Sequence, residues 1–185
     1  MNPYQATLVS VLEVLQEQKM DHLLVGGHVV THYGYTRMTT DIDLMMVIPD
    51  VGAIVKAMRN AGFTSYSISP LVIFFQKSEP SIRVDFLRID MGTFTKLMRS
   101  AVTANILGCQ VIIPSLTDLL AMKFFSYSQS PMRRFKDLDD IVCLSNANKL
   151  NPEAILRPLA LRFADEEAYQ RVYAMLPPNP ERNAP

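Results

Sequence analysis

Two glycines and a pair of aspartates, with thirteen residues between them, constrain this chain more than any other feature of its sequence. Gly26-Gly27 follows the short apolar run 23–25, and the aspartates open the mostly apolar run 41–48. Side chains alternate along a strand, so Asp41 and Asp43 point to one face while the apolar residues next to them point to the other. The pattern predicts a strand over 41–48 that is anchored in a core and carries two carboxylates on its other face.

Two carboxylates this close repel each other unless a cation lies between them. Mg²⁺ suits the position, because it is a hard ion that commonly takes one or two protein carboxylates together with phosphate oxygens; Mn²⁺ is the alternative ion. Asp85, between two apolar residues of a later strand candidate, would complete a site for two ions. We predict Asp41, Asp43 and Asp85 as catalytic residues and metal ligands. The alternative is three ordinary aspartates at solvent-facing strand ends.

The glycine pair ends one strand candidate and opens a helix that stops near Gly34. Backbone N–H groups at the start of a helix attract phosphate, and glycine lets the phosphate come close. A nucleoside triphosphate would then bridge Gly26-Gly27 and the metal ions, which is the layout of phosphoryl or nucleotidyl transfer. A plain tight turn is the alternative explanation of the two glycines.

The remaining pattern predicts an α/β (α+β) chain, with a mixed sheet flanked by helices and an all-helical C-terminal third. Apolar spacing, caps and turn residues set the expected elements. Strands are expected at 23–25, 41–48, 71–77, 82–88 and 109–113, the third and fourth as a hairpin, and helices at 4–19, 28–33, 51–61, from 116, at 131–145, from 151 and at 165–176. We expect a core over 1–114, a helical part packed on it over 115–176, and a disordered tail over 177–185.

Composition excludes several classes of protein. The chain has 185 residues and no net charge, which fits one globular unit and argues against a protein that coats nucleic acid. Cys109 and Cys143 form no CxxC motif, so neither a disulfide framework nor a structural zinc site is supported. His28 and His32 lack the glutamate that a zinc protease places after its first histidine. No apolar run is long enough to span a membrane and the N-terminus lacks a targeting pattern, so we expect a cytoplasmic protein with no membrane partner.

These residues resemble a known family. Gly-Gly, a spacer, Asp-x-Asp and a later aspartate resemble the DNA polymerase β-like nucleotidyltransferase fold. More narrowly, the run 37–44, followed by Lys123 and the run 134–140, is similar to the AbiEii/AbiGii-type nucleotidyltransferase toxins over roughly residues 20–145. The resemblance implies that Lys123 contacts the triphosphate and that Asp137 is needed. The predicted nucleotide-binding residues are Gly26, Gly27, Thr39, Lys123 and Asp137.

One position departs from the wider pattern. Many members of the fold have Gly-Ser where this chain has Gly26-Gly27, so one hydroxyl ligand of the phosphate is lost while the backbone contacts remain. Lys123 and Asp137 also have ordinary explanations. The lysine stem would pack in its apolar helix while the amine reaches water, and the aspartate would pair with Arg133 or Arg134 along its own helix.

The resemblance implies a Mg²⁺-dependent enzyme that transfers a nucleoside monophosphate from a nucleoside triphosphate to an acceptor. The acceptor would be the end of a tRNA or other RNA, or a protein. The chain would then be the toxin of a toxin–antitoxin system and would have a cognate antitoxin. The alternative from a different class is a non-catalytic nucleotide-binding or partner-binding module on the same scaffold. Such a module would be expected to have lost an acid or the lysine, and all of them are present here.

Overall fold

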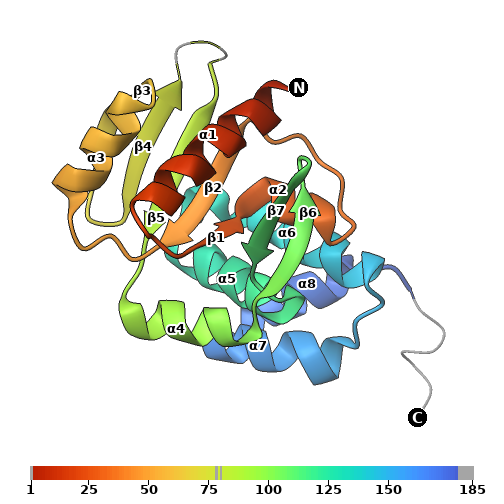
Figure 1. Ribbon diagram of the computed structural model, residues 1–185. Coiled ribbons are helices and arrows are strands. Elements are labelled where there is room, and N and C mark those ends of the chain that lie inside the picture. The colour runs from red at the N-terminus through yellow and green to blue at the C-terminus, as the bar shows by residue number, and fades with distance from the viewer. Residues whose placement is uncertain (1, 78, 80, 179–185) are drawn as a thin grey trace. The chain divides into compact units, whose positions relative to one another are not determined.

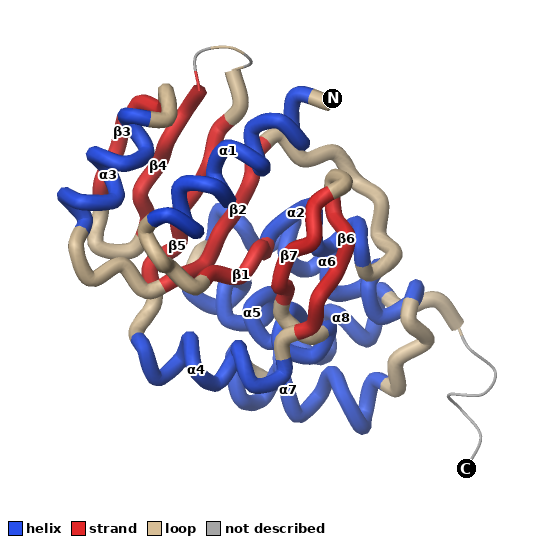
Figure 2. Tube along the Cα trace, in the orientation of Figure 1, coloured by secondary structure: helices blue, strands red, loops and turns tan. Residues whose placement is uncertain are grey.

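The chain forms two compact units. Unit 1 comprises Met1–Val29 and Arg37–Ser115, and unit 2 comprises Val30–Thr36 and Leu116–Pro185. The computed structural model describes residues 2–77, 79 and 81–178. In this described part all strands belong to unit 1, as the red segments of Figure 2 show, and unit 2 is helical.

Unit 1 is built on a five-stranded sheet in the order β1-β2-β5-β4-β3. Strands β2 and β5 pair in parallel, whereas the other neighbours pair antiparallel. The sheet is therefore mixed, which confirms the predicted fold class, and β4 and β5 form the predicted hairpin. The strands are β1 His22–Val25, β2 Asp41–Met46, β3 Phe63–Ile68, β4 Val72–Lys77 and β5 Arg83–Arg88.

Strand β2 shows the predicted alternation. Ile42, Leu44 and Met46 are fully buried, while Asp41 and Asp43 are only partly covered. The buried face continues on the neighbouring strands, where Phe75 and Phe86 meet edge to face with their ring centroids 5.0 Å apart. Burying one apolar face of β2 orients the strand, and this orientation holds both carboxylates on the opposite face.

The helices of unit 1 begin at side-chain caps. Asn2 accepts a hydrogen bond from the Tyr4 amide (2.9 Å), and Asp50 and Asp90 accept from amides three residues ahead (both 2.9 Å). Helices α1 and α3 touch each other and, as Figure 1 shows, lie on the same side of the sheet. The helices are α1 Pro3–Glu17, α3 Val51–Asn60 and α4 Met91–Ser100, and α2 Gly26–His32 contains the boundary between the units.

Three elements of unit 1 were not predicted from the sequence: β3, α4 and the first strand of a two-stranded ribbon. The ribbon pairs β6 Val102–Ile106 with β7 Cys109–Ile113. Its turn consists of Leu107 and Gly108, with φ angles of 54° and 75°. Two central residues with positive φ are typical of the tight type I′ turn. Leucine is uncommon in that conformation, which is why the sequence did not suggest a hairpin here.

The described residues of unit 2 from Leu116 onward form four α-helices, which confirms the predicted helical C-terminal third. They are α5 Leu116–Gln129, α6 Arg134–Ala147, α7 Arg157–Phe163 and α8 Glu166–Met175. Two expected helices start differently from the prediction, because a 3₁₀ turn precedes α6 and a π-helical turn precedes α7. Asn151 is an N-cap as expected, accepting from the Ala154 amide at 3.0 Å.

None of the helices in the described ranges has the length and apolar character needed to cross a membrane. Most of the predicted disordered tail, residues 179–185, lies outside the described residues.

Candidate active site

The three predicted acids lie together on two neighbouring strands of unit 1. In the parallel pairing of β2 with β5, Asp43 is directly opposite Asp85, and Asp41 is opposite Arg83. One carboxylate oxygen from each acid lies within 4.8 Å of the other two. Asp85 is buried, with 4% of its surface exposed, whereas the other two acids are partly exposed. The strand register therefore brings Asp85, which is distant in sequence, to the Asp41 and Asp43 pair and completes one triad.

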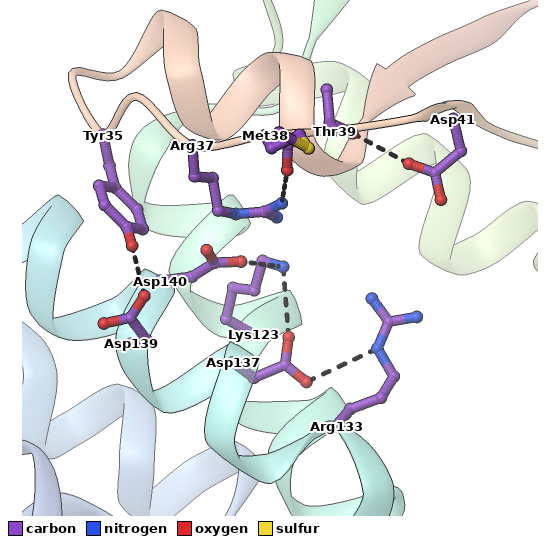
Figure 3. A network of polar contacts seen from close by, with 10 residues as sticks. All are labelled: Tyr35, Arg37, Met38, Thr39, Asp41, Lys123, Arg133, Asp137, Asp139 and Asp140. Atoms are coloured by element: carbon purple, nitrogen blue, oxygen red, sulfur yellow. Dashed lines mark hydrogen bonds and ion pairs between the residues drawn. The ribbon is translucent and has the colours of Figure 1, made fainter.

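Thr39 orients the first acid of the triad. Its hydroxyl donates a hydrogen bond to Oδ1 of Asp41 at 2.9 Å, which Figure 3 shows as a dashed line. The bond uses one carboxylate oxygen and leaves the second available. Thr39 was predicted to bind nucleotide, and in the structure its hydroxyl contacts a triad acid.

Removing this hydroxyl should weaken cation binding. We expect Thr39→Val, which keeps the shape of the side chain, to lower the affinity for Mn²⁺ about tenfold, because groups that orient a metal ligand typically contribute 10- to 100-fold to affinity. Thr39→Ser keeps the donor and should bind like the unsubstituted protein. Isothermal titration with Mn²⁺ measures both variants. Equal affinities for the valine and serine variants would contradict the assigned role.

The two glycines bring the backbone of unit 1 against these side chains. Val25 pairs with Asp43, so Gly26 follows directly at the edge of the triad. Gly26 has a φ of +73°, and a Cβ atom there would lie 2.6 Å from Cγ of Asp43. A Cβ on Gly27 would lie 2.6 Å from Cβ of Thr39. Both distances are too short for real atoms, so an acid and its orienting threonine occupy the space that glycine leaves.

A fourth charged residue, Arg83, joins the triad and was not singled out from the sequence. Its Nε and Nη2 donate to the two oxygens of Asp85, both at 2.6 Å. The guanidinium carbon also lies 4.2 Å from the ring centroid of Phe74 on β4. Residues two apart on a strand share a face, so the spacing of Arg83 and Asp85 was a usable signal.

His28, in the first turn of α2, also lies close to this cluster. Burial lowers the pKa of its imidazole below the ordinary value of 6.5; Asp41 opposes this shift and Arg37 adds to it. The ring packs edge to face against Tyr4, with centroids 5.8 Å apart. His28 is therefore neutral at pH 7, when an imidazole has one N–H donor and one acceptor nitrogen.

The donor set fits a divalent cation. Carboxylate oxygens are the hard ligands that Mg²⁺ and Mn²⁺ take. Three carboxylates at this separation repel one another strongly, and a guanidinium already lies against one of them. Positive charge is thus part of the stable arrangement, and Asp41, Asp43 and Asp85 are the residues that could hold a cation.

Unit 2 contains a separate buried network around Lys123. The amine of Lys123 on α5 contacts Oδ1 of Asp137 at 3.2 Å and Oδ2 of Asp140 at 2.6 Å, both on α6. The two aspartates are fully buried and the lysine is 6% exposed. Figure 3 shows the amine between the two acids. The amine lies between two buried acids instead of extending into water, so the ordinary explanation considered for Lys123 is wrong.

Asp137 does form an ion pair with the expected Arg133, although this arginine ends the 3₁₀ turn before α6 and is not part of that helix. Nε of Arg133, four residues earlier, lies 3.9 Å from Oδ2 of Asp137, while Oδ1 faces the lysine. At that distance the contact is an ion pair without a hydrogen bond, and Oδ2 is a buried atom with no hydrogen-bond partner. Asp137 thus links an exposed arginine to a buried lysine. Asp140, which completes the network, was not singled out from the sequence.

A second contact in unit 2 involves Tyr35 and the next acid of α6. The hydroxyl of Tyr35 donates to Oδ2 of Asp139, which raises the pKa of the tyrosine above its usual range. Burial and the nearby Asp139 also raise the pKa of the Cys143 thiol. Cys143 is therefore a thiol at neutral pH and not an activated nucleophile.

Comparison with known families identifies the chain. A family model described as the nucleotidyl transferase AbiEii toxin of type IV toxin–antitoxin systems matches residues 13–184. The chain belongs to the AbiEii nucleotidyltransferase family. This confirms the resemblance seen in the sequence and extends it across the helical C-terminal third.

Solved structures show the same fold. The antibiotic-resistance factor ANT(2″)-Ia in solution superposes with a TM-score of 0.64 at 16% identity, over 94% of this chain and 98% of that chain. Lincomycin-bound LnuA, a lincosamide antibiotic adenylyltransferase, gives 0.54 at 15% identity over 76% and 95%. An antigenic nucleotidyltransferase-like protein from Paracoccidioides brasiliensis gives 0.52 at 19% identity over 93% of both chains. The comparison with curated proteins found no match.

Family membership and fold together support a transferase that moves a nucleotidyl group. At these identities the solved structures show the fold alone.

Proposed function

We propose that this AbiEii family member is a metal-dependent nucleotidyltransferase that transfers a nucleoside monophosphate from a nucleoside triphosphate to an acceptor, with loss of pyrophosphate. The observation that carries the proposal is the triad of Asp41, Asp43 and Asp85, whose ligand oxygens lie within 4.8 Å of one another. Oxygen donors at this separation suit Mg²⁺, with Mn²⁺ as a substitute.

In unit 1 the proposed roles follow the positions of the side chains. Asp41 and Asp43 would hold divalent ions, and Thr39 would keep Asp41 oriented through its hydrogen bond. Bound ions would neutralise charge on the phosphates around an in-line displacement. Asp85 would share an ion or accept the proton of the attacking hydroxyl. The backbone at Gly26-Gly27 would contact the phosphates.

In unit 2 we propose Lys123 and Asp137 as nucleotide-binding residues, as the family pattern implies. Lys123 would contribute positive charge toward phosphate. Asp137 and Asp140 hold its amine in one orientation in the structure, so Asp137 would act by positioning the lysine.

The proposal extends to the biological role of the protein and to the acceptor of the nucleotidyl group. The family description names a toxin of a type IV toxin–antitoxin system. We propose that this chain is such a toxin, that an antitoxin opposes it, and that its acceptor is the end of a tRNA or other RNA, or a protein.

One labelling experiment tests the reaction and identifies the acceptor class. Each of the four α-labelled nucleoside triphosphates is incubated with the protein, Mg²⁺ and either total small RNA or total protein. We expect label in one pool with one preferred nucleotide, and no label with Asp43→Ala, which removes the central acid of the triad. Label that persists at full level in Asp43→Ala would contradict the assignment of the site.

A thermal-shift measurement separates the enzyme from a non-catalytic binding module. An enzyme site should be stabilised by nucleotide only together with Mg²⁺, because ligands that bind the folded state raise its stability. That shift should disappear in Asp41→Ala. A shift of equal size without the metal would favour the binding module.

A further inference from the structure

Arg83 places a cation on the metal-binding triad before any metal is bound. Its guanidinium meets Asp85 through two parallel hydrogen bonds of 2.6 Å, one to each carboxylate oxygen. Paired contacts of this kind are among the stronger and more directional interactions of a carboxylate. They occupy about two of the roughly four lone-pair positions that a carboxylate offers.

Two further features set how firmly Arg83 is held. Its guanidinium carbon lies 4.2 Å from the ring centroid of Phe74, which supports it from the neighbouring strand. Its side chain is nevertheless 43% exposed, against 6% for Asp85. The guanidinium therefore borders solvent, whereas the carboxylate that it contacts is buried.

We propose that Arg83 is a resident counter-ion that competes with the divalent cation for Asp85. In the metal-free protein the arginine neutralises the buried carboxylate and limits repulsion within the triad. A cation bound by Asp41 and Asp43 gains the full strength of the third carboxylate when the guanidinium moves away. The inference rests on the proposed function, because it assumes that the triad binds a divalent cation.

The net charge of the triad predicts how the removal of Arg83 changes the affinity for a divalent cation. Three carboxylates carry three negative charges, and Arg83 cancels one of them. Removing the arginine should leave a more negative site that attracts a divalent cation more strongly, although the metal-free protein should be less stable. A purely structural arginine would lower the stability without raising the affinity for the cation.

The test is a Mn²⁺ titration of metal-free, nucleotide-free protein, followed by the electron paramagnetic resonance signal of free Mn²⁺. We expect Arg83→Gln to bind Mn²⁺ about tenfold more tightly than the unsubstituted protein. Adding Asp85→Asn to Arg83→Gln should abolish the gain. An affinity that is unchanged or lower in Arg83→Gln would overturn the proposal.

Arg88→Gln is the matched control, since Arg88 lies on the same strand and donates to the Ser69 carbonyl at 3.1 Å. Three residues of strand place Arg88 roughly 10 Å from Asp85, and alternation puts its side chain on the opposite face of β5, so the Mn²⁺ affinity of Arg88→Gln should stay within about twofold. A gain as large as that of Arg83→Gln would show a general charge effect and overturn the proposal.

Two further variants keep the outcomes separable. Asp43→Asn should abolish Mn²⁺ binding in the otherwise unsubstituted protein, and full retention would overturn the proposed metal site itself together with this inference. If Arg83→Gln fails to fold, as judged by circular dichroism, Arg83→Lys replaces it. Lysine keeps the charge but not the paired geometry, so we expect about threefold tighter binding. Unchanged or weaker binding would overturn the competition.

Discussion

Gly26→Ala is expected to lower nucleotidyl transfer about 100-fold or more while the protein remains folded. The new Cβ would lie 2.6 Å from Cγ of Asp43, so the carboxylate has to move. Displacing a reacting group by about 1 Å commonly costs about 10²-fold in rate. The φ of +73° adds a backbone cost of roughly 1–2 kcal/mol in the free energy of unfolding. Steady-state transfer assays and urea denaturation measure the two effects separately.

Gly62→Ala is the matched control for this substitution. Gly62 also has a positive φ, +85°, but a Cβ there meets no atom within 4 Å. Gly62→Ala should therefore lower the free energy of unfolding by a similar amount without any loss of transfer activity. Equal transfer activity in Gly26→Ala and Gly62→Ala would show that the position of the Asp43 carboxylate does not depend on the absence of a side chain at Gly26.

Lys123→Met is expected to lower the free energy of unfolding by about 3–5 kcal/mol, the range found when one partner of a buried ion pair is removed. The methionine fills the space of the lysine stem, so the loss comes from charge rather than from volume. It leaves two fully buried carboxylates, Asp137 and Asp140, without the amine between them. Urea denaturation gives the magnitude, and faster amide hydrogen exchange in α5 and α6 would locate the effect.

Lys56→Met makes the same chemical change at an exposed position of helix α3 and should alter stability by less than about 0.5 kcal/mol. Asparagine at both Asp137 and Asp140, combined with Lys123→Met, removes the unpaired charges and should recover part of the loss. If Lys123→Met and Lys56→Met had the same free energy of unfolding, this would contradict a stabilising buried charge network around Lys123.

The sequence alone determined the elements with strong local signals. Alternation in β2 predicted that Ile42 and Leu44 would be buried and that Asp41 and Asp43 would share a face, and the structure agrees. Helical spacing located most of the helices, and Asn151 was recognised as a cap from its neighbours. These features depend on residues a few positions apart, so a linear pattern contains the necessary information.

Elements with weak local signals were missed. Strand β3 lies at the edge of the sheet and includes an irregularity in its pairing with β4, so its sequence has no clean alternation. Helix α4 is different: Met91, Phe94 and Met98 recur at helical spacing behind the Asp90 cap, so its sequence did contain a local signal. The turn before β7 places Leu107 at positive φ, and its sequence matches no common turn motif. In β3 and in the turn before β7, pairing or packing with distant residues outweighs local preference.

The contacts of the candidate site were decided by tertiary structure. Only the parallel register of β2 with β5 sets Asp43 opposite Asp85, and only the fold brings Gly26 against Asp43. The packing of α5 on α6 decides that Lys123 meets two acids instead of water. Residue types and spacing can indicate which side chains take part in a reaction. The distances between segments, however, depend on how the whole core packs. The sequence thus named the triad acids, Asp137 and the lysine, and the fold determined what each of them touches.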